Sequence, residues 1–316
     1  MTTKSLTFQY DGISFQFEIG AEESIISGNV ESTGSWEDNQ LSLYRDLIGD
    51  HGVFVDIGAN VGINSIFAKL SQPNARVVAV EPEPRNFAIL SRNAEKYGVE
   101  LNNLAIADQP GQMGFAGTGT NAHFTADKDA IQVECVTLDA FTQSLGHIDL
   151  MKIDVEGFTD LVLSEASAAL RRTSSVIIEF SYGDTESRLR TMGNVTPSRA
   201  DVVEHSEELF DQLRPHFSHF YYISRHHGLV DLKDTADLYE IMFSEAAVGD
   251  ILATKVPMQG AISGLAMAFR MVCELRQHNH LRLSSIQALD ARVGELEGAG
   301  TTKPQRSRLR EILGQN

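Results

Sequence analysis

The segment that most constrains the fold of this chain is VFVDIGANVGINS, which runs from Val53 to Ser65. It begins with a short apolar run, typical of a buried strand, that ends at Asp56. The chain then passes through Gly58 and Gly62 into a sequence with helical spacing. Glycine lets the backbone approach a ligand closely, and a helix N-terminus offers N–H groups to an anion. The segment therefore predicts a strand that delivers a ligand-binding turn.

The spacing of this turn distinguishes between nucleotide cofactors. It reads Asp56-x-Gly58-x-x-x-Gly62, whereas a dinucleotide fingerprint reads G-x-G-x-x-G. This form suits an amino-acid head group better than a pyrophosphate, and Asp56 could accept a hydrogen bond from its ammonium group. Glu81 ends the next predicted strand, ARVVAVE, where a carboxylate can bind both ribose hydroxyls. The pair of elements predicts binding of a nucleoside that carries an amino acid.

Strands and helices alternate along the central part of the chain. Buried strands are expected at Ala75 to Glu81, Leu101 to Ala107, Asp149 to Asp154 and Ser175 to Phe180, and helices at Asn86 to Lys96, Leu161 to Arg171 and Val202 to Leu213. This alternation favours a parallel sheet covered on both faces. HFYYIS and DILATK indicate a closing antiparallel pair. We expect a Rossmann-like α/β fold with a mostly parallel seven-stranded sheet.

Less regular segments flank this core. Leu6 to Ile19 predicts a hairpin that turns at Asp11-Gly12, and Asn39 to Ile48 predicts a helix. Extra strands are expected at Gly111 to Gly119 and Ile131 to Leu138, around a polar loop in which His123 could reach the pocket.

The expected division is a cap over residues 1–50, a catalytic domain over 51–256 and a helical tail over 257–316. In the tail, apolar residues from Leu265 to Leu296 recur at intervals of three or four. That spacing suits a helix packed on its own domain, or one that forms a homodimer or recruits a partner enzyme.

A second chemical motif is DLMKIDVEG, from Asp149 to Gly157. Alternation along a strand places Lys152 and Asp154 on one face, at the sheet edge where open α/β folds bind ligands. Asp154 or Glu156 could accept a substrate proton and would favour a bound cation, with Lys152 as an orienting or oxyanion-stabilising group. Glu179 is a further candidate at the same edge. The alternative is a structural polar cluster that caps the sheet.

Together these motifs resemble the FkbM family of S-adenosylmethionine-dependent methyltransferases. The resemblance runs from about Trp36 to Lys255, and its densest matches are VDIGANVG, VVAVEPEPRNF, NLAIAD, VTLDAF, DLMKIDVEG and VIIEF. It implies a class I methyltransferase domain that acts mainly on hydroxyl groups of sugars, polyketides or other natural products. The polar insertion around His123 is longer than the family pattern.

The resemblance also implies which residues hold the cofactor, S-adenosylmethionine. Its ribose would lie against Glu81, and NLAIAD would lie along its adenine, with Asp108 as the polar candidate. The methionine part would be held by the first glycine motif, through Asp56, Gly58, Asn60, Gly62 and Asn64.

Composition limits the partners. The formal net charge of −17 over 316 residues disfavours nucleic acid and anionic membrane. The N-terminal segment has no continuous apolar stretch, so we expect a cytoplasmic protein. Two cysteines and scattered histidine pairs lack metal-ligand spacing, which predicts no metal site.

We therefore expect an S-adenosylmethionine-dependent methyltransferase, with O-methylation of a small-molecule or glycan acceptor and Asp154 as the first candidate base. One alternative is an NAD(P)-binding oxidoreductase of the same architecture, which would require G-x-G-x-x-G after the first strand. The other is a non-catalytic domain whose tail recruits a partner.

Overall fold

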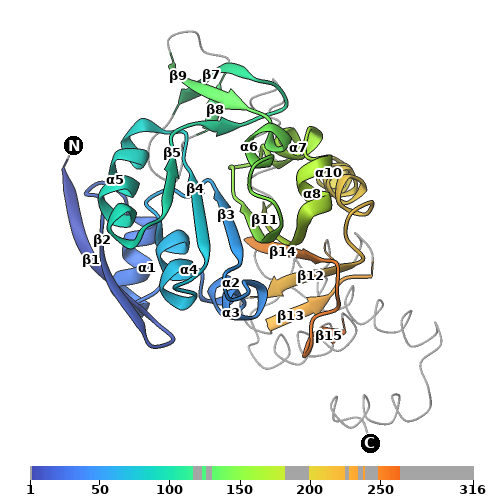
Figure 1. Ribbon diagram of the computed structural model, residues 1–316, viewed down its shortest axis with the longest axis horizontal. Helices are drawn as coiled ribbons and strands as arrows, with labels where there is room; N and C mark the ends of the chain where they lie inside the picture. Colours follow the sequence, from blue (N-terminus) through green and yellow to red (C-terminus); the bar gives the residue numbers. More distant parts are fainter. Residues whose placement is uncertain are drawn as a thin grey trace, which may run out of the picture.

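A mixed, mostly parallel sheet organises the protein in the computed structural model (Figure 1). The structure describes residues 2–116, 123–125, 130–181, 199–224, 228–233, 238 and 248–263. Within these residues the sheet has the strand order β15-β13-β12-β14-β11-β10-β3-β4-β5. The bounds of its strands are β3 Val53–Ile57, β4 Arg76–Val80, β5 Glu100–Asn102, β10 Ile148–Ile153, β11 Thr173–Ser181, β12 His219–Ser224, β13 Gly228–Asp231, β14 Val248–Thr254 and β15 Ile262–Ser263.

This sheet confirms the expected α/β class. Strands β5, β4, β3, β10 and β11 are parallel neighbours, and β14 runs antiparallel between β11 and β12. These are the seven strands that the sequence predicted, including the closing antiparallel pair. Strands β13 and β15 extend the sheet to nine among the described residues.

Alternating side chains on the strands bury two separate cores, one on each face of the sheet. On β3, for example, Phe54 enters one core while Val55 and Ile57 enter the other, as the period of two requires. The first face is covered by α1 Ile25–Thr33, α2 Asp38–Leu41, α3 Tyr44–Leu47, α4 Ile63–Ser71 and α5 Pro84–Ala94, which leads into the short 3-10 helix Glu95–Tyr97. The second face is covered by α6 Leu138–Thr142, α7 Thr159–Ser164, α8 Ser167–Arg172 and α10 Arg199–Leu213.

The predicted N-terminal hairpin is confirmed, with β1 Thr3–Tyr10 paired to β2 Ile13–Gly20. Its turn residues, Asp11 and Gly12, have φ values of 47° and 77°, the left-handed pair of a two-residue hairpin turn. The helix α1 that follows was not predicted. The expected helix from Asn39 to Ile48 is instead two short helices, α2 and α3, separated at Ser42, whose hydroxyl donates to the carbonyl of Asn39.

The expected third strand, Leu101 to Ala107, is divided between two sheets. Its first part is β5, and its second part is β6 (Ala105–Ile106), which pairs with β9 (Ile131–Val136) in a smaller sheet. Between them the side chain of Asn103 donates to the carbonyls of Glu81 and Pro82, at 2.9 and 3.0 Å, which turns the chain out of the main sheet.

The smaller sheet also holds β7 (Gly111–Ala116) and β8 (His123–Thr125). His123 therefore begins a strand inside the segment expected to be a loop, and its side chain lies outside the described residues.

The expected helix from Leu161 to Arg171 is also two helices, α7 and α8. The carboxylate of Asp139 accepts hydrogen bonds from the N–H groups of Ala168 and Ala169 at 3.0 and 2.7 Å. An external cap of this kind marks the start of a second helix rather than the middle of one.

The C-terminal region is described only as far as Ser263. The strand β15 pairs with β13, so the main sheet extends past the expected boundary at residue 256. Residues 264–316 lie outside the described part of the chain, so the helical tail and its role in a homodimer or partner complex remain predictions. None of the helices in the described ranges is long and apolar enough to span a membrane.

Candidate functional site

A cavity of about 760 Å³ lies at the carboxyl ends of β3, β4, β10 and β11. Its floor is formed by the strand tips and the loops that follow them, including the turn after β3 and the segment Lys152 to Glu156. Its opposite wall comes from α1 and from residues 33–40 of the N-terminal region. One cavity therefore joins both motifs that the sequence singled out.

The turn after β3 is hydrogen-bonded to the end of β4 and packs closely against the loop after β10. The N–H groups of Gly58 and Ala59 both donate to the carbonyl of Val80, at 2.9 Å each. Gly58 has a φ of 83°, and a Cβ there would lie 1.7 Å from the carbonyl oxygen of Asp154. Glycine is thus required at position 58 because of the neighbouring loop as well as the backbone angle.

Glu81 is fixed at the tip of β4 by backbone donors. Its Oε2 accepts from the N–H of Asn60 and its Oε1 from the N–H of Glu83, both at 2.9 Å. Asn60 adopts a left-handed φ of 49° to present this N–H. Burial raises the pKa of Glu81 to about 7, against the effect of these two hydrogen bonds. Each carboxylate oxygen has further acceptor capacity, which suits a diol.

A buried polar chain connects the start of α4 to the N-terminal cap. The hydroxyl of Tyr44 donates to Asn64 Oδ1 at 2.6 Å, and Asn64 Nδ2 donates to Glu37 Oε2 at 2.8 Å. Glu37 has a left-handed φ of 55°, an uncommon conformation for a residue with a side chain. Burial raises the pKa of Glu37, while Lys152 opposes the shift.

Lys152 lies at the centre of the acidic groups and is only 2% exposed. Its Nζ is 2.6 Å from Asp154 Oδ2 and 3.9 Å from Glu37 Oε2. Burial alone would lower its pKa, but the carboxylates of Asp154, Glu37 and Asp56 together hold the pKa well above its usual value. Lys152 therefore stays protonated and cannot act as a base at neutral pH.

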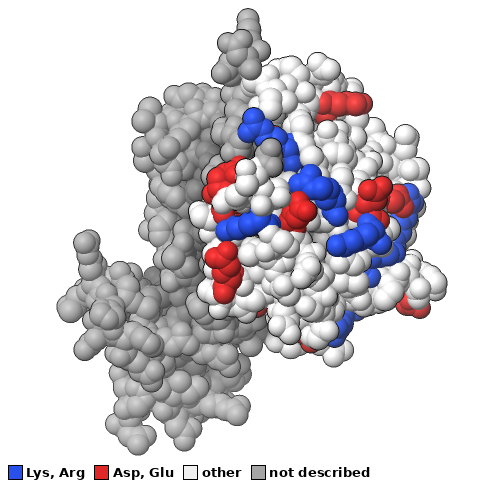
Figure 2. Space-filling model, turned by 90° about the vertical axis from the view of Figure 1, so that its left-hand side faces the viewer, with Lys and Arg blue, Asp and Glu red and all other residues white. Residues whose placement is uncertain are grey.

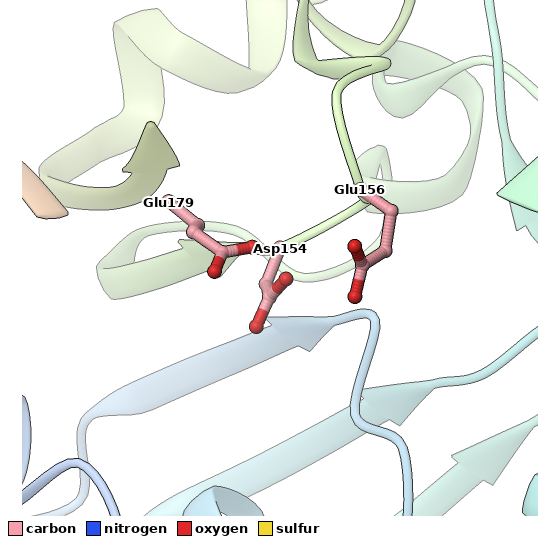
Figure 3. A group of neighbouring side chains, drawn as sticks. All are labelled: Asp154, Glu156 and Glu179. Carbon is pink, nitrogen blue, oxygen red and sulfur yellow. The ribbon is translucent and has the colours of Figure 1, made fainter. Parts of the chain in front are cut away.

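Asp154, Glu156 and Glu179 bring their carboxylates together at the end of β11 and the loop after β10 (Figure 3). Burial would raise the pKa of Asp154, but Lys152 and a hydrogen bond with Glu179 lower it.

The three carboxylates lie within 4.8 Å of one another, a spacing that a cation could bridge, although the sequence predicted no metal site. Lys152 already places a positive charge beside Asp154.

Asp250, on β14, is a further acid on the cavity wall, directly opposite Glu179 in the strand register. Burial, reinforced by the nearby Glu37, raises its pKa to about 8. Asp250 is therefore mostly protonated at neutral pH, whereas Asp154 is ionised.

Most of the predicted site residues line the cavity, namely Gly58, Asn60, Asn64, Glu81, Lys152, Asp154, Glu156 and Glu179. Asp56, Gly62 and Asp108 do not. Asp56 is completely buried beneath the turn, where its Oδ2 accepts from the hydroxyl of Ser65 at 2.6 Å, and burial raises its pKa to about 6. Asp56 thus lies behind the cavity wall, and its contact with a ligand ammonium stays a prediction.

The other two predicted residues, Gly62 and Asp108, do not line the cavity either. Gly62 makes room for α5, because a Cβ there would lie 2.6 Å from Leu90 Cδ1. Asp108 lies just past the lining segment Leu104 to Ile106, whose side chains are apolar.

The sequence analysis missed Gln40 and Asp250, which both line the cavity and are hydrogen-bonded to each other, and it gave Glu37 no role. Asp250 had a usable signal, because an antiparallel strand begins at the edge where its parallel neighbour ends. An acid near the start of DILATK therefore lies at the ligand-binding edge. Glu37 and Gln40 reach the cavity only because the cap folds over it, and we find no local pattern that predicts this.

Comparison with known proteins identifies the family. The model described as "Methyltransferase FkbM domain" matches residues 56–224. The hexuronic acid methyltransferase AglP of Haloferax volcanii is 25% identical over 159 residues, which are 46% of this chain and 63% of AglP. The 31-O-demethyl-FK506 methyltransferase FkbM of Streptomyces tacrolimicus is 36% identical over 83 residues, 22% of this chain and 32% of that protein.

The chain spans less than two thirds of the length of these curated relatives. A solved O-methyltransferase from Bacillus cereus in complex with SAH covers 74% of this chain and 91% of its own, with 14% identity and a TM-score of 0.41. Because the family match extends over more than half of the sequence, this protein belongs to the FkbM methyltransferase domain family.

Proposed function

We propose that this protein is an S-adenosylmethionine-dependent O-methyltransferase that acts on a hydroxyl group of a sugar, glycan or natural product. The observation that supports this most directly is the single cavity that joins Glu81 and the turn after β3 to the carboxylates at Asp154. Relatives named as methyltransferases of a hexuronic acid and of 31-O-demethyl-FK506 support acceptors of this kind.

The residues of the cavity fit the cofactor's chemical groups. Glu81, with backbone donors on both oxygens, is oriented to accept hydrogen bonds from the ribose hydroxyls. The apolar segment Leu104 to Ile106 suits the adenine face. The turn from Gly58 to Asn60 and the start of α4 also line the cavity, where they would face the methionine part of the cofactor. S-adenosylmethionine supplies an electrophilic methyl group on a sulfonium centre.

Asp154 is the residue best placed to receive the acceptor's proton. Its side chain is 21% exposed, it lines the cavity, and Lys152 keeps it ionised. A carboxylate with a low pKa is too weak a base to deprotonate a free alcohol. It can still accept the hydrogen bond and take the proton as the oxygen bonds to carbon. Lys152 fixes the orientation of Asp154 through the 2.6 Å contact.

Calorimetry with S-adenosylhomocysteine and with NADH tests the cofactor. We expect binding of the first and none of the second, and the reverse result would favour the oxidoreductase alternative.

Asp154→Asn tests the base. We expect it to bind S-adenosylhomocysteine as the wild type does while methyl transfer from a labelled cofactor to extract metabolites falls by about 10²–10⁴-fold. Glu156→Gln is the matched control at the same edge, with a smaller loss expected. Full activity of the Asp154 variant would remove Asp154 as the base.

A further inference from the structure

The N-terminal cap reaches the proposed base through Lys152. On β10, Leu150 packs in the core that α1 to α5 cover, and side chains along a strand alternate with a period of two. Lys152, two positions later, therefore points to the side of the sheet on which the cap lies. Its Nζ is 2.6 Å from Asp154 Oδ2 and 3.9 Å from Glu37 Oε2. One buried ammonium group is thus within reach of a carboxylate from the loop after β10 and of one from the cap.

The side chain of Glu37 is held in place by its own neighbours. Asn64 Nδ2 donates to Glu37 Oε2 at 2.8 Å, and the side chain of Trp36 also forms a hydrogen bond with this carboxylate. The hydroxyl of Tyr44 donates to Asn64 Oδ1 at 2.6 Å. Because an amide has an acceptor at one end and a donor at the other, this bond determines which end of Asn64 faces Glu37.

The backbone of Glu37 is fixed as well, in a conformation that costs energy. Its φ of 55° lies in the left-handed region, which residues with a side chain rarely adopt. Its carbonyl accepts from the N–H groups of Gln40 and Leu41, at 3.0 and 3.1 Å, at the start of α2. Glycine would adopt this φ without strain, so the contacts of the Glu37 side chain must offset the cost. Residues held in this way cluster at functional sites.

The contacts of Glu37 favour its ionised form. Burial and the nearby Asp154 raise its pKa, whereas Lys152, Asn64 and Trp36 lower it, because each of these three interacts favourably with the charged carboxylate. Lys152 is protonated, since the surrounding carboxylates hold its pKa well above the usual value. Opposite charges 3.9 Å apart attract each other more strongly in a buried site than in water, because the effective dielectric constant is lower there.

We propose that Glu37 is a positioning residue for methyl transfer, which holds Lys152 in the place from which its ammonium group orients Asp154. The inference rests on the proposed function, in which Asp154 receives the proton of the acceptor. It adds a residue from outside the segment that the family model matches, residues 56–224. A misplacement of about 1 Å near the reacting groups can cost about a hundredfold in rate, so a shift of Lys152 affects turnover even where cofactor binding is unchanged.

Glu31 is a matched control, because it is an acid of the same cap in different surroundings. On the face that carries the N-terminal hairpin, acidic and basic side chains are interspersed (Figure 2). Glu31 of α1 pairs with Lys4 of β1 at 3.3 Å, and their side chains are 55% and 32% exposed. An exposed pair of this kind contributes little. Substitution by glutamine removes one negative charge at either position and keeps the size of the side chain.

The two glutamine variants test the role of Glu37. Full-length wild type, Glu37→Gln and Glu31→Gln are incubated with a metabolite extract and methyl-labelled S-adenosylmethionine, and mass spectrometry follows the rate of labelled-product formation. Calorimetry measures the affinity of each for S-adenosylhomocysteine. We expect the rate to fall about tenfold with Glu37→Gln and to stay at the wild-type value with Glu31→Gln, with affinity unchanged in both. An unchanged rate in Glu37→Gln, or a loss of affinity that equals the loss of rate, overturns the inference.

A double-mutant cycle tests whether Glu37 acts through Asp154. Because Asp154→Asn removes the proposed base, Glu37→Gln should cause no further loss of rate in that background. A purely structural role would lower the rate by the same factor in both backgrounds, and that result overturns the positioning role. If the wild type binds S-adenosylhomocysteine but forms no labelled product, the proposed function fails and this inference fails with it. Labelled product formed equally by wild type and Glu37→Gln overturns the inference alone.

Discussion

The hairpin face and the cavity both contain acidic and basic side chains, but these side chains differ in their exposure to solvent and in how they are paired. Glu18 on strand β2 of the hairpin pairs with Arg92 of helix α5, and both side chains are more than a third exposed. This contact with Arg92 lowers the pKa of Glu18. In the cavity, Lys152 is almost completely buried among several carboxylates, and burial raises the pKa of Glu81 and Asp250 instead.

The difference separates charges paired at the solvent-exposed surface from charges buried around the cavity. Exposed pairs contribute about 0–1 kcal/mol and can be lost with little effect. Buried acids are costly to the folded state, and perturbed pKa values gather at functional sites. An acid excess around one buried lysine therefore marks the cavity as the functional region. Matched substitutions in the two regions can test this contrast.

The largest contrast is expected from removal of the two cations. Lys152→Met leaves Asp154 and Glu37 without their partner, and we expect the free energy of unfolding to fall by about 3–5 kcal/mol at pH 7.5. Arg92→Met should change it by less than about 1 kcal/mol. Chemical denaturation of both variants measures the difference, and equal losses would contradict it. At pH 5 the difference in stability loss between the two variants should be smaller, because the carboxylates left without Lys152 then gain protons.

Two glycines with similar backbone angles give the next contrast. Gly58 and Gly12 have φ values of 83° and 77°, but only Gly58 has an atom in the way of a Cβ. Gly12→Ala should cost about 1–2 kcal/mol for the left-handed backbone alone. Gly58→Ala adds an overpacking term of about 1–3 kcal/mol and should also weaken binding of S-adenosylhomocysteine. Thermal unfolding measures the loss of stability and calorimetry the loss of binding. Similar losses of stability in both variants would mean that the loop after β10 can move to accommodate a side chain at position 58.

Two glutamates in the same regions should differ in ligand binding. Glu81→Ala should weaken S-adenosylhomocysteine binding by about 1–3 kcal/mol, because the ribose hydroxyls lose their acceptor. Glu18→Ala should leave the dissociation constant unchanged. Wild-type affinity should rise as the pH passes upward through about 7, where Glu81 loses its proton. Unchanged calorimetric affinity in Glu81→Ala would reject the ribose assignment.

The last contrast concerns the pH dependence of stability. Because burial raises the pKa of Asp250 to about 8, from 3.8, the folded state holds this proton more tightly than the unfolded chain. The stability it contributes is complete below about pH 4 and is lost as the pH rises to about 8. Asp250→Asn should make this decline shallower, as measured by urea unfolding between pH 5 and 8.5. Glu18, whose pKa is lowered, acts in the opposite direction, at acid pH.

Much of the fold follows from local patterns in the sequence. The apolar runs at β3, β4, β10 and β11 are short and bounded by glycine or acidic residues, so their place in a parallel sheet can be predicted. The same reasoning places Glu81, Lys152 and Asp154 at one edge, because parallel strands end together. The hairpin turn at Asp11-Gly12 is equally local.

What could not be predicted depends on contacts between distant parts of the chain. Asp56 stands at a strand end like Glu81, but its side chain meets Ser65 of α4 rather than the cavity, and its sequence position does not distinguish the two outcomes. Asn103 ends β5 through carbonyls some twenty positions earlier. Glu37 contacts residues far along the chain, through a hydrogen bond with Asn64 and an ion pair with Lys152.

The contact between Gly58 and Asp154 has a consequence for engineering this protein. The carbonyl oxygen of Asp154 fills the space that a side chain at position 58 would take, so the cofactor turn and the acid loop interlock and must change together. A library aimed at either loop would therefore disturb the other. Helix α1 faces the same cavity through Ile25, Ile26 and Asn29, and these positions can be varied without touching the contact between Gly58 and Asp154.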